Sequence, residues 1–119
     1  MDPGALGSLG VGTGFSMAAK LAHPNKEVVC LYGDGAFGMT AFDMETAQRF
    51  GAPYLAVIGN NSAMNQIRYG QLAKYGEERG DGWNKRGDVA FTKLGDMIVG
   101  HCKEVTKASQ IQPAKQRER

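Results

Sequence analysis

The sequence predicts an α/β domain built around a parallel sheet. Two short apolar runs, residues 27–32 and 54–58, contain β-branched side chains and have the profile of buried parallel strands. A helical pattern lies between them and is joined to each run by a short connection. A strand, a helix and a strand in this order form a βαβ unit, whose crossover is right-handed in nearly all known cases.

The segments around these strands contain residues that start or stop helices. Residues 1–14 are predicted to form a Gly-rich loop, and residues 15–22 a helix that stops before Pro24, because proline breaks helical pairing. Thr40 is expected to cap the crossover helix at its N-terminus. Gly51 is expected to close the same helix, since glycine accepts the left-handed conformation found at C′.

The pattern is less regular after the second strand. We expect helical turns over residues 65–75, interrupted near Gly70, and an exposed loop over the polar residues 76–88. The remaining expected elements are a helix over 89–99, a third strand over 101–105 and a final helix from Ser109. The helix over 89–99 is expected to place four apolar side chains on one side: Phe91, Leu94, Met97 and Ile98.

The composition excludes several classes of function. The 119 residues fit one small domain, with 14 basic and 12 acidic side chains. Five of the basic residues lie in the last 17 positions, and the rest of the chain is close to neutral, so neither a nucleic-acid groove nor a membrane-binding face is expected. Two cysteines, Cys30 and Cys102, give no disulfide framework. With no signal peptide and no membrane-length apolar run, the expected location is the cytoplasm.

Glycine is the most unusual feature of the composition. The chain has 17 glycines, about twice the usual share of roughly 7%. Eight of them fall within the first 38 residues. Such clustering predicts tight turns and a backbone that comes close to a ligand.

Polar residues follow both predicted strands. The first strand runs into Gly33-Asp34-Gly35 and the second into Gly59-Asn60-Asn61. Ligands of parallel sheets bind outside the carboxyl ends of the strands, so Asp34 and the Asn pair are expected side by side. Their oxygen atoms suit Mg²⁺ or Ca²⁺, and Mg²⁺ in particular where phosphate oxygens complete the octahedron. The two glycines keep Cβ atoms away, and the pattern predicts a metal–diphosphate site.

Each motif also has a purely structural interpretation. Gly-Asp-Gly is a common turn, and an Asn pair at the end of a strand often caps backbone groups. Taken separately, either motif is structural more often than not. Their occurrence at adjacent strand ends of one βαβ unit favours the ligand site.

The spacing of these motifs resembles a known family. Gly33-Asp34-Gly35, 24 further residues and then Asn60-Asn61 are similar to the metal–cofactor signature of thiamine-diphosphate enzymes. The resemblance covers residues 4 to about 75 well and the remainder loosely. It implies a three-layer α-β-α fold with a mainly parallel sheet, incomplete at its N-terminal end.

The resemblance assigns cofactor contacts to individual residues. It implies Mg²⁺ ligation by the side chains of Asp34 and Asn61 and the carbonyl of Ala63. Leu9, 25 positions before Asp34, would wedge between the two cofactor rings, although an ordinary core role is the alternative. The remaining implied cofactor contacts are the Gly7 carbonyl toward the aminopyrimidine, the backbone of Ala36 and Phe37 toward the diphosphate, and Gly33, Gly35 and Met64.

Within this family the chain looks most similar to the acetolactate-synthase-like group, which includes oxalyl-CoA decarboxylase and 2-hydroxyacyl-CoA lyases. The implied function is the thiamine-diphosphate- and Mg²⁺-binding domain of a carbon–carbon lyase or ligase that acts on a 2-keto acid or a 2-hydroxyacyl-CoA. The alternative is a non-catalytic phosphate-binding or dimerisation module on the same fold.

The resemblance also implies partners for the chain. Residues 1–119 would form part of the diphosphate-binding domain, with the pyrimidine-binding and middle domains absent. The glutamate that activates the cofactor belongs to the pyrimidine-binding domain of another subunit, and Glu45 does not match it. We therefore assign no catalytic residue here, and expect a homo-oligomer, a dimer or tetramer, at full length and little activity from this chain alone.

Overall fold

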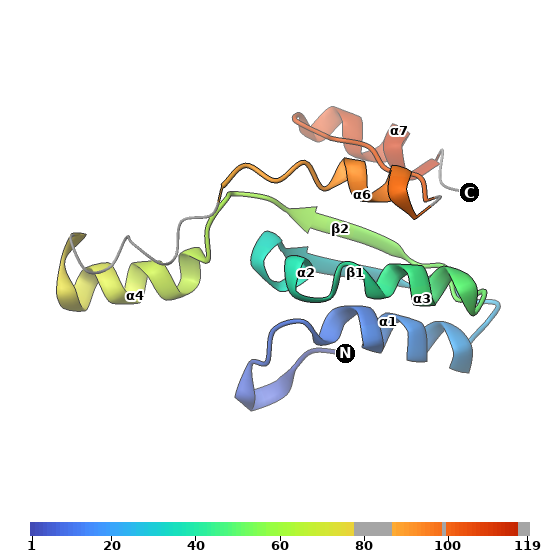
Figure 1. The fold of residues 1–119 in the computed structure, drawn as a ribbon, viewed down its shortest axis with the longest axis horizontal. Helices are drawn as coiled ribbons and strands as arrows, with labels where there is room; N and C mark the ends of the chain where they lie inside the picture. Colours follow the sequence, from blue (N-terminus) through green and yellow to red (C-terminus); the bar gives the residue numbers. More distant parts are fainter. Residues whose placement is uncertain (78–86, 99, 117–119) are drawn as a thin grey trace. The chain divides into compact units, whose positions relative to one another are not determined.

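The structure is a computed structural model that describes residues 1–77, 87–98 and 100–116. The chain divides into two compact units, Met1–Asp88 and Val89–Arg119, which we describe separately. Figure 1 shows their elements along the chain. No helix in the described part of the chain is long and apolar enough to cross a membrane.

The first unit is organised by two parallel strands. Strand β1 (Val29–Gly33) pairs with β2 (Leu55–Gly59) in a register that sets Leu31 beside Val57 and Gly33 beside Gly59. Two helices, α2 (Asp34–Thr40) and α3 (Asp43–Arg49), connect the strands (Figure 1). The βαβ unit expected from the sequence is therefore confirmed, with each strand beginning and ending slightly later than predicted.

The crossover begins earlier than the sequence suggested. Helix α2 starts at Asp34, directly after β1, and Thr40 is its last residue. The prediction that Thr40 caps the crossover helix was wrong, because its hydroxyl donates instead to the carbonyl oxygen of Gly10 at 2.9 Å. One helix was expected here, and the chain forms two with a break at Ala41 and Phe42.

The end of α3 agrees with the prediction for Gly51. This glycine has φ 62°, and its amide donates to the Gln48 carbonyl at 3.0 Å. The next amide, of Ala52, donates to the Ala47 carbonyl at 2.8 Å. These two bonds form a Schellman motif, which satisfies the last carbonyls of the helix and turns the chain toward β2.

Helix α1 (Val11–Ala22) begins four residues before the predicted start. Gly10 precedes it in a left-handed conformation with φ 82°, which ends the loop containing the short 3-10 helix η1 (Gly4–Leu6). Gly12 brings α1 close to β1, since a Cβ atom there would lie 2.5 Å from the Tyr32 ring and 3.0 Å from the sulfur of Cys30. Gly12 thus serves the packing of helix α1 on strand β1.

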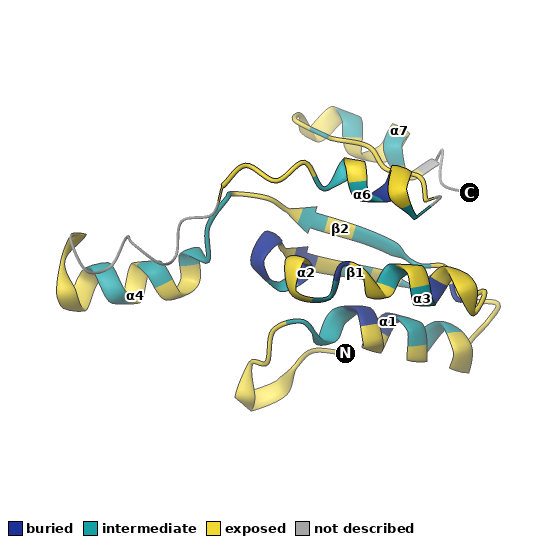
Figure 2. Cartoon of the chain, in the orientation of Figure 1, coloured by how far each residue is buried: buried dark blue, intermediate teal, exposed yellow. Residues whose placement is uncertain are grey.

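The core of the first unit lies where α1, α2 and α3 meet one face of the sheet (Figure 2). Tyr32 packs edge-on against Phe37, with ring centroids 5.2 Å apart. The small side chains of Ala41, Ala47 and Ala52 complete the buried apolar set. Thr13 is fully buried beside them.

The opposite face of the sheet is exposed within this unit. Val29, Leu31 and Val57 point away from Tyr32, because successive side chains of a strand alternate between faces. Leu31 is 78% exposed. The strands were expected to be buried on both faces, and the helices α1 to α3 bury only one.

Helix α4 (Asn65–Tyr75) follows β2 and runs through Gly70 without a break, so the predicted interruption was wrong. It has no buried residue. Most of the loop predicted over residues 76–88 lies outside the described residues.

The second unit contains short helices. They are α6 (Thr92–Met97), the 3-10 helix η2 (Ala108–Gln110) and α7 (Ile111–Gln116), and the last two confirm the predicted final helix. Helix α6 is shorter than the predicted helix over 89–99, and residue 99 lies outside the described residues. Met97 was expected on the apolar side of this helix, but its side chain is 68% exposed.

The predicted third strand over residues 101–105 was wrong, because these residues take no regular structure. A strand needs a neighbour to satisfy its backbone, and the described part of this unit supplies none. Cys102 packs instead on Gly95 of α6, where a Cβ atom would collide with the cysteine side chain.

We predict that Gly12→Ala destabilises the protein by about 1–3 kcal/mol, the usual cost of overpacking, because the added methyl group meets the Tyr32 ring. Gly14→Ala is the matched control in the same helix, where a Cβ atom would meet nothing within 4 Å. That change should stabilise the helix by roughly 0.8–1 kcal/mol. Urea denaturation measures both, and equal effects of the two substitutions would contradict the packing role.

The buried hydroxyl of Tyr32 predicts a loss of stability at alkaline pH. Burial raises the pKa of Tyr32 well above its usual value, with a further contribution from its hydrogen-bonded neighbours. The folded state therefore holds this proton more tightly than the unfolded state, and stability is lost as pH rises above about 10. In Tyr32→Phe the decline with pH should be shallower in thermal denaturation, whereas Tyr75→Phe, on an exposed ring, should leave it unchanged.

Candidate functional site

The carboxyl ends of β1 and β2 form the candidate site. Gly33 and Gly59 are register partners, so the residues that follow them lie at one edge of the sheet. Asp34 is only 3% exposed. Its Oδ1 accepts a hydrogen bond from the Gly35 amide at 2.6 Å, and its Oδ2 accepts one from the Ala63 amide at 3.2 Å.

The same edge holds the other two predicted metal ligands. The Ala63 amide lies 3.2 Å from Asp34 Oδ2 and 3.3 Å from Asn61 Oδ1. One N–H group is thus shared by both side-chain oxygens. The structure therefore brings together Asp34, Asn61 and Ala63, although they come from two different strand ends.

The chain reaches this arrangement through a tight turn after β2. Asn60 Oδ1 accepts a hydrogen bond from the Ser62 amide at 3.2 Å, and Asn61 does the same for Ala63, so two Asx turns overlap. Ser62 has φ 53°, an uncommon conformation for a residue other than glycine. The two asparagines thus hold the turn that carries Ala63 back to Asp34.

Ser62 makes a contact that sequence reasoning missed. Its hydroxyl donates to the carboxylate of Asp88 at 3.1 Å, 26 positions along the chain. The bond ties the end of the first unit to the Asn turn. No sequence signal could have found it, because serine and aspartate at such a distance form no motif.

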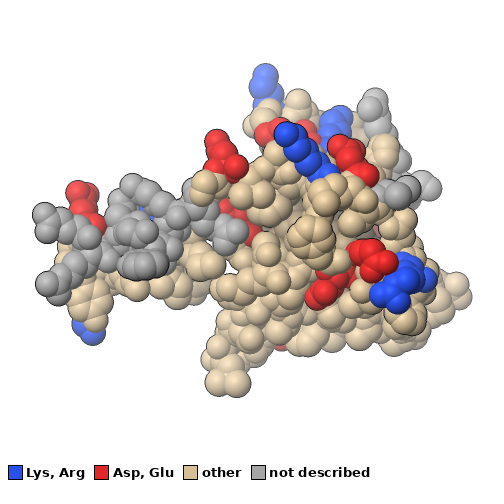
Figure 3. Space-filling view, viewed as in Figure 1, with Lys and Arg blue, Asp and Glu red and all other residues tan. Residues whose placement is uncertain are grey.

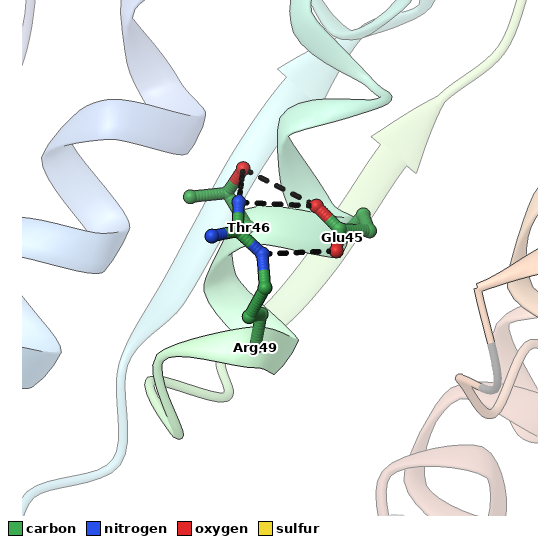
Figure 4. Close-up of polar contacts among 3 residues, drawn as sticks. All are labelled: Glu45, Thr46 and Arg49. Carbon is green, nitrogen blue, oxygen red and sulfur yellow. Dashed lines mark hydrogen bonds and ion pairs between the residues drawn. The ribbon is translucent and has the colours of Figure 1, made fainter.

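Asp34 faces no cationic side chain among the described residues. One ion pair of the first unit joins Arg49 to Glu45 at 3.1 Å on α3, with Thr46 beside it (Figure 4). Both partners of this pair are more than half exposed, so it contributes little to stability. Glu45 is therefore a surface residue, in agreement with its exclusion as an activating glutamate.

The donor set at this edge suits a hard divalent cation. A buried carboxylate needs compensating charge, and two amides supply only part of it. No cluster of three His, Cys, Asp or Glu side chains occurs within the described ranges. A carboxylate, an amide oxygen and a carbonyl fit Mg²⁺ when a ligand supplies further oxygens.

The Gly-rich loop and the end of β1 share one groove. A cavity of about 330 Å³ is lined by Leu9 and Gly10 of the loop and by Gly33 and Ala36 beside Asp34, among others. Leu9 is 48% exposed, so it is not an ordinary core residue within the first unit. A Cβ atom on Gly33 would meet nothing within 4 Å, which leaves space there for a ligand.

The remaining predicted cofactor residues have different surroundings. Phe37 is 2% exposed and packs on Tyr32, so its side chain belongs to the core. The Gly35 amide is engaged by Asp34. Gly7 is exposed at the end of η1 and does not line the groove, and Met64 is half-buried directly before α4.

The face drawn in Figure 3 shows no competing charged patch on the part of the chain that the structure describes. On the face drawn in Figure 3, acidic and basic side chains are interspersed over the described residues, without a broad patch of one sign. This distribution agrees with the near-neutral composition of the body of the chain.

Comparison with known proteins identifies the family. The model for the thiamine pyrophosphate enzyme C-terminal TPP-binding domain matches residues 1–118. The chain belongs to this family. The resemblance seen in the spacing of Gly33-Asp34-Gly35 and Asn60-Asn61 is thereby confirmed.

Among its relatives, the chain is 45% identical to 2-hydroxyacyl-CoA lyase 2 of Mus musculus over 78 residues, which are 66% of this chain and 12% of the lyase. It is 36% identical to an acetolactate synthase large subunit of Mycobacterium tuberculosis over 117 residues, which are 98% of this chain and 21% of the synthase. The chain therefore spans between about an eighth and a fifth of the length of these relatives.

A solved structure shows the same fold. The thiamine diphosphate-dependent 4-hydroxybenzoylformate decarboxylase of Rhodococcus jostii RHA1 superposes with a TM-score of 0.84 at 23% identity, over 96% of this chain and 21% of the decarboxylase. The α/β fold class predicted from the sequence, with a parallel sheet, is confirmed.

Proposed function

We propose that this domain binds Mg²⁺ and thiamine diphosphate at the shared edge of β1 and β2, as part of a carbon–carbon lyase or ligase. The observation that carries the proposal is that the Ala63 amide donates to oxygens of both Asp34 and Asn61, which holds these three residues together. In addition, Asp34 is only 3% exposed and faces no cationic side chain among the described residues. Membership of the thiamine pyrophosphate enzyme family supports the identity of the cofactor.

The proposed roles follow from position. The Asp34 carboxylate, Asn61 Oδ1 and the Ala63 carbonyl would hold Mg²⁺, whose remaining positions suit diphosphate oxygens. The amides of Ala36 and Phe37 lie in the first turn of α2, at the end of the helix that favours anions, and would donate to the diphosphate.

The groove that joins Leu9 to Gly33 and Ala36 supports a place for the cofactor rings beside the diphosphate. In this arrangement Leu9 supports the rings from one side, and Gly33, with no side chain, leaves room for the diphosphate. Thiamine diphosphate, when bound, would supply a thiazolium ring that stabilises a carbanion on the carbon derived from the substrate's carbonyl group. This chain's residues bind and orient the cofactor, and we assign none of them a proton transfer.

The substrate class rests on the relatives. Those named above are a 2-hydroxyacyl-CoA lyase and an acetolactate synthase, which supports a 2-hydroxyacyl-CoA or a 2-keto acid as substrate. We further propose that a pyrimidine-binding domain of another subunit completes the site, within a homo-oligomer. A cytoplasmic location is part of the same proposal, and the absence of a disulfide between Cys30 and Cys102 is compatible with it.

The binding proposal predicts that Asp34→Asn weakens thiamine diphosphate binding about tenfold or more, equivalent to roughly 1.4 kcal/mol, because a metal ligand loses its charge. Asp43→Asn, on an exposed residue at the start of α3, is the matched control and should bind as the unaltered chain does. Titration calorimetry with Mg²⁺, repeated with a chelator, measures the affinities. Equal affinity of the two variants would sink the site assignment.

The catalytic proposal predicts activity only in a complete assembly. Joined to the pyrimidine-binding and middle domains of a related lyase, the chain should support cleavage of a 2-hydroxyacyl-CoA or formation of acetolactate from pyruvate. Asp34→Asn should remove that activity, and the chain alone should show little. Tight cofactor binding without turnover in every assembly would instead identify a non-catalytic phosphate-binding or dimerisation module.

A further inference from the structure

A chain of hydroxyl groups crosses the core of the first unit. Tyr32 donates to the hydroxyl of Tyr54 at 3.2 Å, and Tyr54 donates to Thr13 Oγ1 at 3.4 Å. Thr13 Oγ1 lies 3.2 Å from Thr40 Oγ1. The last member, Thr40, donates to the carbonyl oxygen of Gly10 at 2.9 Å.

The direction of this chain is fixed at its end. A carbonyl oxygen can only accept, so the Thr40 hydroxyl must donate its proton in the bond to Gly10. Thr13 then donates toward Thr40, whose Oγ1 lies 3.2 Å away and whose carbonyl oxygen lies 3.4 Å away, and it accepts from Tyr54. Every hydroxyl donates once toward Gly10, an arrangement in which successive bonds polarise and strengthen one another.

Two members of the chain, Thr13 and Tyr32, are buried, and Thr40 and Tyr54 are half-buried. Thr13 is 0% exposed and Tyr32 is 7% exposed. A hydroxyl left without a partner in such a place destabilises a protein, whereas an apolar group of the same shape is often tolerated. Valines at the two threonine positions would fill the same space, so packing alone does not require these hydroxyls.

The end of the chain connects the two halves of the candidate site. Gly10 ends the loop that carries Leu9, and a Cβ atom on it would lie 3.3 Å from Thr40 Cγ2 and 3.4 Å from Met39 Cβ. Thr40 is the last residue of α2, and Asp34 is the first. Seven helical residues separate the two ends by about 9 Å of rigid helix, so the Thr40–Gly10 bond sets where Leu9 lies relative to Asp34.

We propose that Thr40, held by Thr13, is a positioning residue that fixes the Leu9–Gly10 segment at a set distance from Asp34. The residues that would contact the rings of the cofactor and those that would hold its diphosphate end are then correctly spaced before the cofactor binds. The inference rests on the proposed function for the identity of the ligand. The hydrogen bond from Thr40 to Gly10, which we call the clamp, is present in the chain without cofactor.

The test compares Thr40→Val, which keeps the shape and removes the hydroxyl, with Thr40→Ser, which keeps the hydroxyl. Thr46→Val, on the surface helix α3, is the control. The first readout is the ¹⁵N order parameter of the Leu9 and Gly10 amides in the cofactor-free protein. We expect a rigid value near 0.85 in the unaltered chain and below about 0.6 in Thr40→Val, with recovery in Thr40→Ser.

The second readout is the Kd of thiamine diphosphate with Mg²⁺, measured by calorimetry. It should rise about tenfold in Thr40→Val, the effect of a loop that must be ordered on binding, and stay unchanged in Thr40→Ser and Thr46→Val. If the unaltered chain binds no cofactor, the proposed function fails, and the order parameters still report on the clamp.

Three results would overturn the inference. One is a rigid Leu9–Gly10 segment in Thr40→Val. Another is a loosened segment with an unchanged Kd. The third is equal loosening of the β1 amides, which would make the hydroxyl a support of the whole core. Thr13→Val provides an independent check, because it leaves the Thr40–Gly10 bond in place and should loosen the segment less than Thr40→Val does.

Discussion

The parallel register of β1 and β2 is the constraint on which the site depends. Pairing Gly33 with Gly59 places Asp34 and the Asn turn at one edge, and a slip of one residue would move every side chain to the other face. The shared Ala63 amide then connects the two strand ends through Asp34 and Asn61. A local backbone pairing thus creates a site from residues 27 positions apart.

Helix α2 transmits this geometry to the rest of the first unit. Its first residue, Asp34, belongs to the strand edge, and its last, Thr40, holds the loop before α1. Gly12 lets α1 approach Tyr32 closely enough for Thr13 to enter the hydroxyl chain. The core and the candidate site are therefore not separate structures, because the same short helix forms part of both.

The sequence predicted the features that depend on local chemistry. The parallel βαβ unit, the Gly51 helix end and the proximity of Asp34 to Asn61 all follow from residue types at fixed offsets. Prediction failed where contacts between residues distant in the sequence decide the structure. Thr40 is a residue type that often caps helices, but its hydroxyl donates to the Gly10 carbonyl instead. The absent strand at 101–105 is similar, since a segment forms a strand only where another strand pairs with its backbone.

The buried carboxylate of Asp34, which faces no cationic side chain among the described residues, links folding to the proposed ligand. Two amides hold the carboxylate in place but cancel little of its charge, and burial removes most of its water. A cation that binds this edge only in the folded chain stabilises that state in proportion to its affinity. Replacing Asp34 by a neutral residue would remove both the buried charge and the metal ligand.

A protein with a lysine or arginine beside Asp34 would be more stable without cofactor, but that side chain would compete with the metal for the carboxylate. The exposed acid–base pair on α3 shows that the chain can form such pairs, and the site has none among the described residues. A cation bound at this edge of the sheet would therefore offset part of the free-energy cost of burying Asp34.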